Sequence, residues 1–388
     1  MHRRHLGTPL TAALLTLALA AGCGTDDAAA PARWSDPSTP PATATAVPPA
    51  AAASAATGAA PADCPRPGPT LRSSSALDPT SASYLGRAGT DVANAVDVAP
   101  NCEIVVGGRF TDVRGTATTT LGRGTGAVLR LDGTGRRLLG VTRLAGTVED
   151  LEVRREGGEI AVATGRGVLL LAPDASAVRW QGPGAASRVA VGSTGTVAAV
   201  VGGAVRVYDP RGATLATIRP DGRKVADVAV DDRTGLVFVG GYRQVAAGPC
   251  VPVQIPYLHA YDRRGKLRWR AYDHPAERLG DRCADSRVER VALGRDGKLY
   301  LAGVTDGGNS VFGRSAADVD RPAPNVATDK FTQPFNTTNA QQTYLARFDP
   351  ASGRQLAGQH LLARIDTKGD KGNTITPYAV TADERGRV

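Results

Sequence analysis

The chain has 388 residues, with 46 Lys and Arg against 37 Asp and Glu and a formal net charge of +9 at pH 7. The basic residues are scattered through expected turns, with no dense basic run and no interleaved aromatic residues, which argues against nucleic acid as a partner. We interpret the charge as a solvated surface that favours anionic wall polymers or lipid headgroups.

Residues 1–22 form a targeting segment. A basic stretch (MHRRH) precedes the apolar run Leu10 to Ala21, which is 12 residues long. A membrane-spanning helix needs about 20 residues, so this run is typical of an export signal.

The signal ends in Leu19-Ala20-Ala21-Gly22-Cys23, which resembles the lipobox of bacterial lipoproteins. The resemblance implies cleavage before Cys23, lipidation of that residue, and anchoring to the outer face of the cell membrane. Ala20 departs from the family pattern, which more often has Leu at this position. The alternative is an ordinary secretory peptide in which Cys23 is incidental, and both interpretations export the protein.

Residues 23–70 are rich in Ala, Pro, Thr and Ser and contain almost no large aliphatic residue. Such a segment cannot bury enough apolar surface to offset its ordering entropy, so we expect a disordered tether. Residues 71–388 remain for the folded domain.

One sequence pattern recurs four times. It consists of an alternating apolar run, then Asp, two or three residues, Gly and a second apolar run. The copies are AVLRLDGTGRRLL at Ala127, AVRVYDPRGATL at Ala204, YLHAYDRRGKLRW at Tyr257 and YLARFDPASGRQL at Tyr344. Asp and Gly are turn residues and the flanking period is that of strands, so each copy predicts a β-hairpin.

A second recurring pattern precedes each hairpin and predicts two more strands, the second often ending in Gly-Gly. Its copies start at Asn94, Glu149, Arg188, Val225, Val288 and Tyr378. Four strands per unit, with the shortest units near the ~40–45 residues of a propeller blade, predict an all-β propeller of four-stranded antiparallel blades. No helical apolar period stands out, so few helices are expected.

The repeats resemble the bacterial propeller families that include the "SBBP" type and the pyrroloquinoline-quinone-like type. GKLYLAGVTDGG at Gly297 carries the first resemblance, and Gly265 to Trp269 with Trp180 carries the second. A parallel β-helix or a two-sheet sandwich is the alternative architecture. Five units plus the start of a sixth are visible, from which we expect a fragment of a six- to eight-bladed propeller.

Apart from Cys23 the chain has Cys64, Cys102, Cys250 and Cys283, which in an exported protein predict two disulfides. In a propeller, Cys250 and Cys283 fall on one face of adjacent blades. Cys102 falls in a turn on the opposite face, within reach of the segment that carries Cys64. This topology selects the pairs Cys64–Cys102 and Cys250–Cys283.

Three long insertions are expected on one face, at Arg109 to Gly126, Tyr242 to Pro256 and Thr305 to Gln342. Loops on one face of a rigid scaffold are usual recognition sites. The candidate contact residues are in the last insertion; they are Phe312, Phe331, Phe335 and Asn336. The alternative is a variable loop without a binding role.

No catalytic signature is present. His259, His274 and His360 fall in different segments and predict no metal triad. Asp366 to Asn373 has closely spaced oxygen ligands, but its two lysines oppose calcium, so a plain turn is the better interpretation. No metal or other cofactor is expected.

We therefore expect a membrane-anchored extracytoplasmic binding or scaffold module without a catalytic site, whose ligand is a protein or a cell-wall polymer. The alternative is a quinone-dependent dehydrogenase, which the quinone-like repeats suggest, or the propeller part of a larger enzyme. A fold alone does not decide between them.

Overall fold

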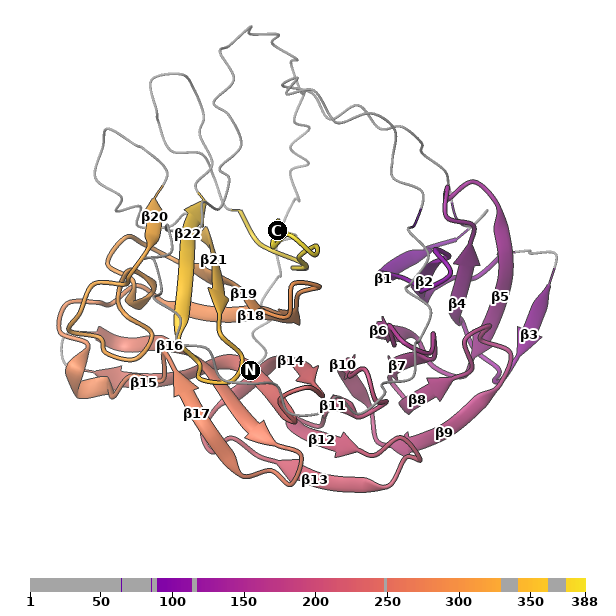
Figure 1. Cartoon of the computed structure of the whole chain (residues 1–388), viewed down its shortest axis with the longest axis horizontal. Coiled ribbons are helices and arrows are strands. Elements are labelled where there is room, and N and C mark those ends of the chain that lie inside the picture. The colour runs from indigo at the N-terminus through magenta and orange to yellow at the C-terminus, as the bar shows by residue number, and fades with distance from the viewer. Residues whose placement is uncertain are drawn as a thin grey trace, which may run out of the picture.

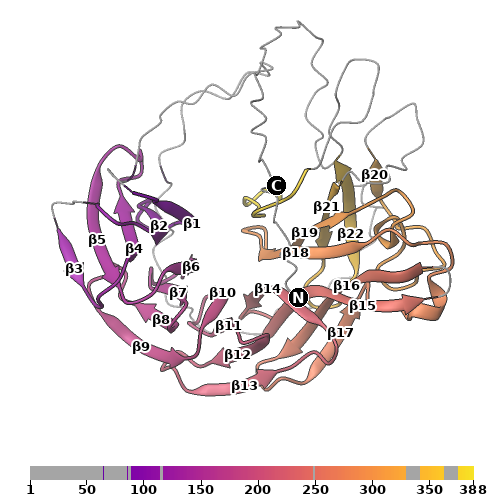
Figure 2. The ribbon, with the colours of Figure 1, turned by 180° about the vertical axis from the view of Figure 1, so that it is seen from behind.

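The computed structural model describes residues 64, 85, 89–113, 117–247, 250–328, 341–361 and 375–388. Within these residues, five sheets are each built on four antiparallel strands, and the helices are limited to two 3-10 turns. The sheets follow one another around an open arc with the first strand of each toward the centre (Figure 1; seen from behind in Figure 2). The chain is therefore all-β, with the propeller blades that the repeats predicted.

The blades are numbered in chain order, and their strands run from the centre outward. Blade 1 contains β1 (Val92–Val98), β2 (Ile104–Arg109), β4 (Gly126–Leu131) and β5 (Leu138–Leu144); blade 2 contains β6 (Val148–Val153), β7 (Ile160–Thr164), β8 (Gly167–Leu171) and β9 (Val178–Pro183). Blade 3 contains β10 (Ala186–Val191), β11 (Val197–Val201), β12 (Ala204–Tyr208) and β13 (Thr214–Ile218). Blade 4 contains β14 (Lys224–Asp231), β15 (Leu236–Ala247), β16 (Cys250–Asp262) and β17 (Leu267–Ala271). Blade 5 contains β18 (Ser286–Leu293), β19 (Leu299–Thr305), β21 (Gln342–Phe348) and β22 (Gln355–Leu361).

Antiparallel order gives the propeller two different faces. The turn face carries the turns between the first and second strands and between the third and fourth strands of each blade. The loop face carries the connections between the second and third strands and those between blades.

Each repeated Asp-Gly motif forms the turn between the third and fourth strands. In blade 3, Asp209 accepts hydrogen bonds from the backbone N–H groups of Arg211 at 2.9 Å and Ala213 at 2.8 Å, while Gly212 has a φ of 87°. Blade 2 has the same turn with Ala175 at a φ of 56°. Because alanine replaces the glycine there, the sequence motif is weak although the turn is preserved.

The two glycines that end a second strand each leave room for a neighbouring group. At Gly240 a Cβ would lie 2.7 Å from Val288 of the next blade, so this glycine makes room for the neighbouring first strand. At Gly241 a Cβ would clash with the carbonyl oxygen of Lys224, where β14 bulges. A bulge occurs at the same place in the first strand of all five described blades, and the sequence analysis did not predict it.

The Gly-Gly pair of blade 3 has a different role from the one expected. Gly202 and Gly203 follow the end of β11 and have φ values of 57° and 79°. Two consecutive left-handed residues build the tight hairpin turn to β12, which needs glycine because a Cβ disfavours this backbone.

The long insertions are more regular than expected. Tyr242 to Pro256 is not a loop, because β15 and β16 continue as a hairpin through it, with Gln244 paired to Gln254. The insertion of blade 1 adds β3 (Thr118–Thr120) parallel to β5, and that of blade 5 adds β20 (Val326–Thr328) parallel to β22.

The two tryptophans of the quinone-like repeats pack between blades. Trp180 lies on Gly212, and Trp269 lies on Gly353, in both cases a turn glycine of the next blade. The Trp269 indole also donates a hydrogen bond of 3.0 Å to the carbonyl oxygen of Pro350. These side chains are part of the blade interfaces.

Residues 375–388 lie beside blade 5 and contain the turn expected for a sixth unit. Gly386 donates its N–H to the carbonyl oxygen of Asp383 at 3.0 Å and has a φ of 69°, as in the corresponding turns of the other blades. Arg295 of blade 5 donates its N–H to the carbonyl oxygen of Ala382 at 3.0 Å, which joins the two segments.

Candidate binding face

Blades 4 and 5 carry a compact structure on the loop face, which we name the loop-face platform. It comprises the outer part of the β15–β16 hairpin, residues 272–285 and residues 306–325. These segments share a small apolar core, separate from the cores between blades, whose buried members are Cys250, Val253, Ile255, Leu279, Val311 and Val319. The alternation of Val253 and Ile255 explains why the hairpin continues as strands, since every second side chain enters this core.

A disulfide between Cys250 and Cys283 joins the hairpin to the segment before β18. A second disulfide joins Cys64 to Cys102 in the first turn of blade 1. Both are the pairs expected from propeller topology. Because disulfides persist in oxidising compartments, they indicate an extracytoplasmic protein.

Ion pairs support the part of the platform that has no regular strands. Arg278 binds Asp318 at 2.9 Å and also contacts Asp320, while the Nε of Arg314 donates to the carbonyl oxygen of Val319 at 2.8 Å. The hydrogen bond from Arg278 lowers the pKa of Asp320 below its ordinary value. These exposed pairs contribute little energy singly, but those of Arg278 join residues 272–285 to residues 306–325.

Phe312 was expected to be a contact residue, and this was wrong, because its side chain is fully buried. Ser310 caps the short 3-10 turn that turns Phe312 inward, by accepting a hydrogen bond from its N–H at 3.0 Å. The ring stacks on Tyr344 with centroids 4.5 Å apart and meets the edge of Tyr272 at 5.1 Å. Phe312 therefore attaches the platform to the blades.

The other sequence-predicted positions lie outside the described residues. They are the lipidation site Cys23, the contact candidates Phe331, Phe335 and Asn336, and the loop from Asp366 to Asn373.

A polar cluster around Asp273 lies at the base of the platform. Its carboxylate accepts hydrogen bonds from Arg223 Nη2 at 2.7 Å, His259 Nε2 at 3.0 Å and Arg243 Nε at 3.1 Å. Burial alone would raise the pKa of Asp273, but the hydrogen bonds from His259 and Arg223 outweigh it and hold the pKa well below its usual range. Tyr272, directly before it, has a φ of 62°, which is strained for a bulky residue.

His259 is held in one tautomer by this cluster. Since the ionised Asp273 accepts from Nε2–H, Nδ1 is the acceptor, and it takes the hydroxyl hydrogen of Tyr261 at 3.1 Å. Burial lowers the pKa of His259 and raises that of Tyr261, so the imidazole is neutral and the phenol is not activated as a nucleophile. The cluster is thus suited to holding segments together rather than to nucleophilic catalysis.

Acidic residues of the innermost strands bind the next blade, a role that the sequence reasoning missed. Each accepts a backbone N–H from the first strand of the following blade, at 2.8–3.1 Å: Asp97 from Val153, Asp150 from Val189, Glu152 from Val191 and Asp227 from Val291. These N–H groups lie on the inner edge of a sheet and would otherwise lack a partner among the described residues.

Burial raises the pKa of these inner carboxyls, to about 6 for Asp150, about 7 for Asp227 and about 8 for Glu152. Arg188 occupies the position of Asp150 and Asp227 in blade 3, so the junction between blades 3 and 4 lacks this bond. Acidic residues that interrupt the apolar residues of a first strand, as in VEDLEV and VADVAV, are the signal that could have revealed the pattern.

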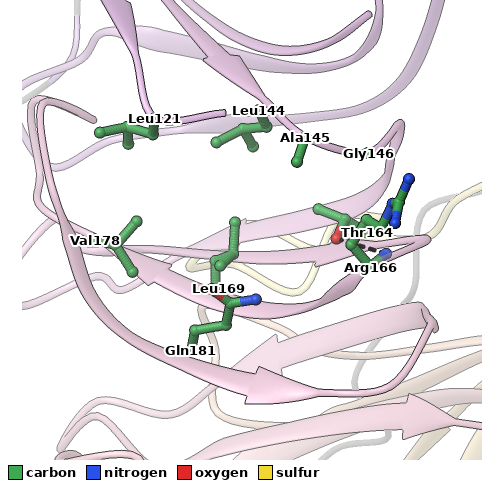
Figure 3. Close-up of a pocket in the computed structure, with 9 residues that line it drawn as sticks. All are labelled: Leu121, Leu144, Ala145, Gly146, Thr164, Arg166, Leu169, Val178 and Gln181. Carbon is green, nitrogen blue, oxygen red and sulfur yellow. Dashed lines mark hydrogen bonds between the residues drawn. The ribbon is translucent and has the colours of Figure 1, made fainter. Parts of the chain in front are cut away.

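A small pocket lies between blades 1 and 2 (Figure 3). Leu121, Leu144, Leu169 and Val178 line its apolar part, and Thr164 and Arg166 lie at one end. The Thr164 hydroxyl is occupied by the turn, where it accepts from the N–H groups of Arg166 and Gly167 at 3.1 and 3.0 Å. This lining offers no acid–base pair for catalysis.

In the part of the chain that the structure describes, no three His, Cys, Asp or Glu side chains come together as a metal site. Among the same residues no helix has the length and apolarity needed to cross a bilayer.

Comparison with known proteins gives no family. No protein-family profile matches the chain, and no curated protein matches it. Among solved structures, hydrazine synthase of Kuenenia stuttgartiensis is similar with a TM-score of 0.48 and 12% identity, over 78% of this chain and 75% of that one. A similarity at this level supports no argument about function.

Proposed function

We propose that the chain is an exported binding module that presents the loop-face platform to a partner protein at the cell envelope. The lipid anchor at Cys23 and the tether of residues 23–70 belong to this proposal and rest on the lipobox resemblance. The two disulfides support the compartment.

The observation that carries the proposal is the construction of the platform. Three segments of blades 4 and 5 share one core and one disulfide, whereas blade 3 forms its four strands without such insertions. A surface that is ordered before binding loses less conformational entropy when a partner docks, so such ordering favours recognition.

The test uses exposed alanines of the platform. Ala246→Arg combined with Ala317→Arg adds two bulky charges to the platform surface without touching its core. Cross-linking in intact cell envelopes should lose a specific partner with this variant. The matched control, Ala213→Arg with Ala351→Arg, alters exposed alanines of the turn face and should keep that partner. Identical partner sets for both variants would contradict the proposal.

The quinone-dependent dehydrogenase remains the alternative prediction. Packing between blades accounts for Trp180 and Trp269, so these residues no longer favour it. The purified protein supplied with pyrroloquinoline quinone and calcium should be assayed for dye reduction with alcohols and sugars. Substrate-dependent reduction would favour the enzyme.

A further inference from the structure

Exposed cations gather at the outer turns of the turn face, those between the third and fourth strands. All five described blades contribute to this set, which we name the turn-face cations: Arg136, Arg137, Arg179, Arg211, Arg264, Lys266, Arg268 and Arg354. Each lies in such a turn or within two residues of it.

The side chains of these cations have few partners among the described residues, unlike those of most other arginines. Only Arg268 forms an ion pair with a described residue, at 3.6 Å from Asp262. By contrast, arginines of the inner turns are paired, as in Arg154 with Glu159 at 2.7 Å and Arg295 with Glu384 at 3.1 Å. Arg263 in the outer turn of blade 4 pairs with Asp232 at 2.6 Å and is therefore not one of the turn-face cations. The available positive charge therefore lies at the outer rim of the turn face.

The aspartates of the outer turns accept hydrogen bonds from backbone N–H groups of the same turns. Asp132 accepts the N–H of Arg136 at 3.0 Å, and Asp262 accepts those of Arg264 at 2.9 Å and Lys266 at 3.0 Å. Hydrogen bonds hold the pKa of both aspartates below the ordinary value, so both stay ionised but are directed toward backbone amides. The guanidinium groups of the same turns project into solvent.

The Cys64–Cys102 disulfide lies on this face as well. Cys102 is in the first turn of blade 1, so the disulfide fixes residue 64 on the turn face. Residue 64 is therefore held on the side that carries the turn-face cations.

We propose that the turn face docks on an anionic phospholipid surface through the turn-face cations. Turns from all five described blades end on the same side of the propeller, which suits a planar surface better than a single flexible chain. Guanidinium groups bind phosphate with paired hydrogen bonds, and cations close to an anionic bilayer contribute about 1 kcal/mol each.

The same turns argue against nucleic acid as the occupant. None of the outer turns contains an aromatic residue, and Trp180 and Trp269 of the adjoining strands pack on glycines. Single-stranded nucleic acids bind by stacking bases on exposed rings, which this surface does not offer. Because the turn-face cations supply the contact, docking is electrostatic and weakens with salt.

The test measures sedimentation of the full chain carrying Cys23→Ser, so that no acyl chain contributes. Vesicles of phosphatidylcholine alone are compared with vesicles that also contain phosphatidylglycerol, at low and high salt. The turn-face variant is Arg136→Gln, Arg211→Gln, Arg264→Gln and Arg354→Gln. Its control removes the same charge from exposed residues of the loop face, with Arg123→Gln, Arg166→Gln, Arg219→Gln and Arg321→Gln.

Binding should require phosphatidylglycerol, decrease with salt, and weaken by about tenfold or more in the turn-face variant. The loop-face control should bind within about twofold of the parent, since the four charges that it loses lie far from the membrane and are screened. Equal losses in both variants, no binding, or tighter binding to soluble polyphosphate or single-stranded DNA than to vesicles would each overturn the proposal. Equal melting temperatures of the variants exclude misfolding.

Discussion

Blades 3 and 4 have the same four strands and the same outer hairpin, but they differ between the second and third strands. Blade 3 closes this connection with Gly202 and Gly203, whereas blade 4 extends both strands by a hairpin that ends near Cys250. The inner strands pack alike in both, since Val189 and Val228 are each almost fully buried. The four strands are therefore the same in both blades, and the two blades differ in the connection between the second and third strands.

We expect the strongest loss of stability at the glycines that distinguish the two blades. Gly241→Ala should destabilise the protein by about 3 kcal/mol or more, because the new Cβ meets the carbonyl oxygen of Lys224 at the bulge of β14. Gly202→Ala should cost about 1–2 kcal/mol, because space is open there and only the positive φ is strained. Denaturant unfolding of both variants measures the difference, and equal losses would show that the bulge is not the constraint.

The next prediction concerns the disulfide of the loop-face platform. Replacing Cys250 and Cys283 together by Ser should lower stability by about 2–3 kcal/mol, since the disulfide closes a separation of 33 residues. Hydrogen exchange should show lost protection at the tip of the β15–β16 hairpin, with β11 and β12 of blade 3 unchanged. The matched control replaces Cys64 and Cys102 and should leave the tip protected; exchange that spreads equally through blade 3 would contradict an independent platform.

The last prediction concerns the buried acids of the first strands, which are present in blade 2 and absent from blade 3. The folded pKa of Glu152, about 8, lies above its ordinary 4.5, so its contribution is present at low pH and is lost as pH rises through about 8. Glu152→Gln still accepts the Val191 N–H and should therefore gain about 1–2 kcal/mol over the parent at pH 8.5 but little at pH 4.5. Glu156→Gln in the exposed turn of blade 2 controls for net charge, and a gain that does not depend on pH would contradict the assignment.

The sequence predicted the features that local chemistry determines. The Asp and Gly positions identified the outer hairpins, and the propeller topology identified both cysteine pairs. Ala175 shows the limit, because an alanine can adopt the left-handed φ of its turn and so removes the glycine signal.

Features that depend on neighbouring blades could not be predicted in the same way. Phe312 resembles an exposed loop residue in the sequence, and only its stacking on Tyr344 explains its burial. The inner acids likewise bind N–H groups about 40–60 residues away, so no local pattern assigns them a partner. The β15–β16 hairpin was mistaken for a loop because the core that it enters is supplied by distant segments.

The short parallel strands β3 and β20 have a consequence for self-association. They cover the outer edges of blades 1 and 5, whereas β9, β13 and β17 are the last strands of their sheets in the part of the chain that the structure describes. Arg179 on β9 and Arg268 and Arg270 on β17 place charges that discourage another strand from pairing there. Strand β13 carries no charge and exposes Leu215, so we expect aggregation of the propeller to begin by strand addition at that edge.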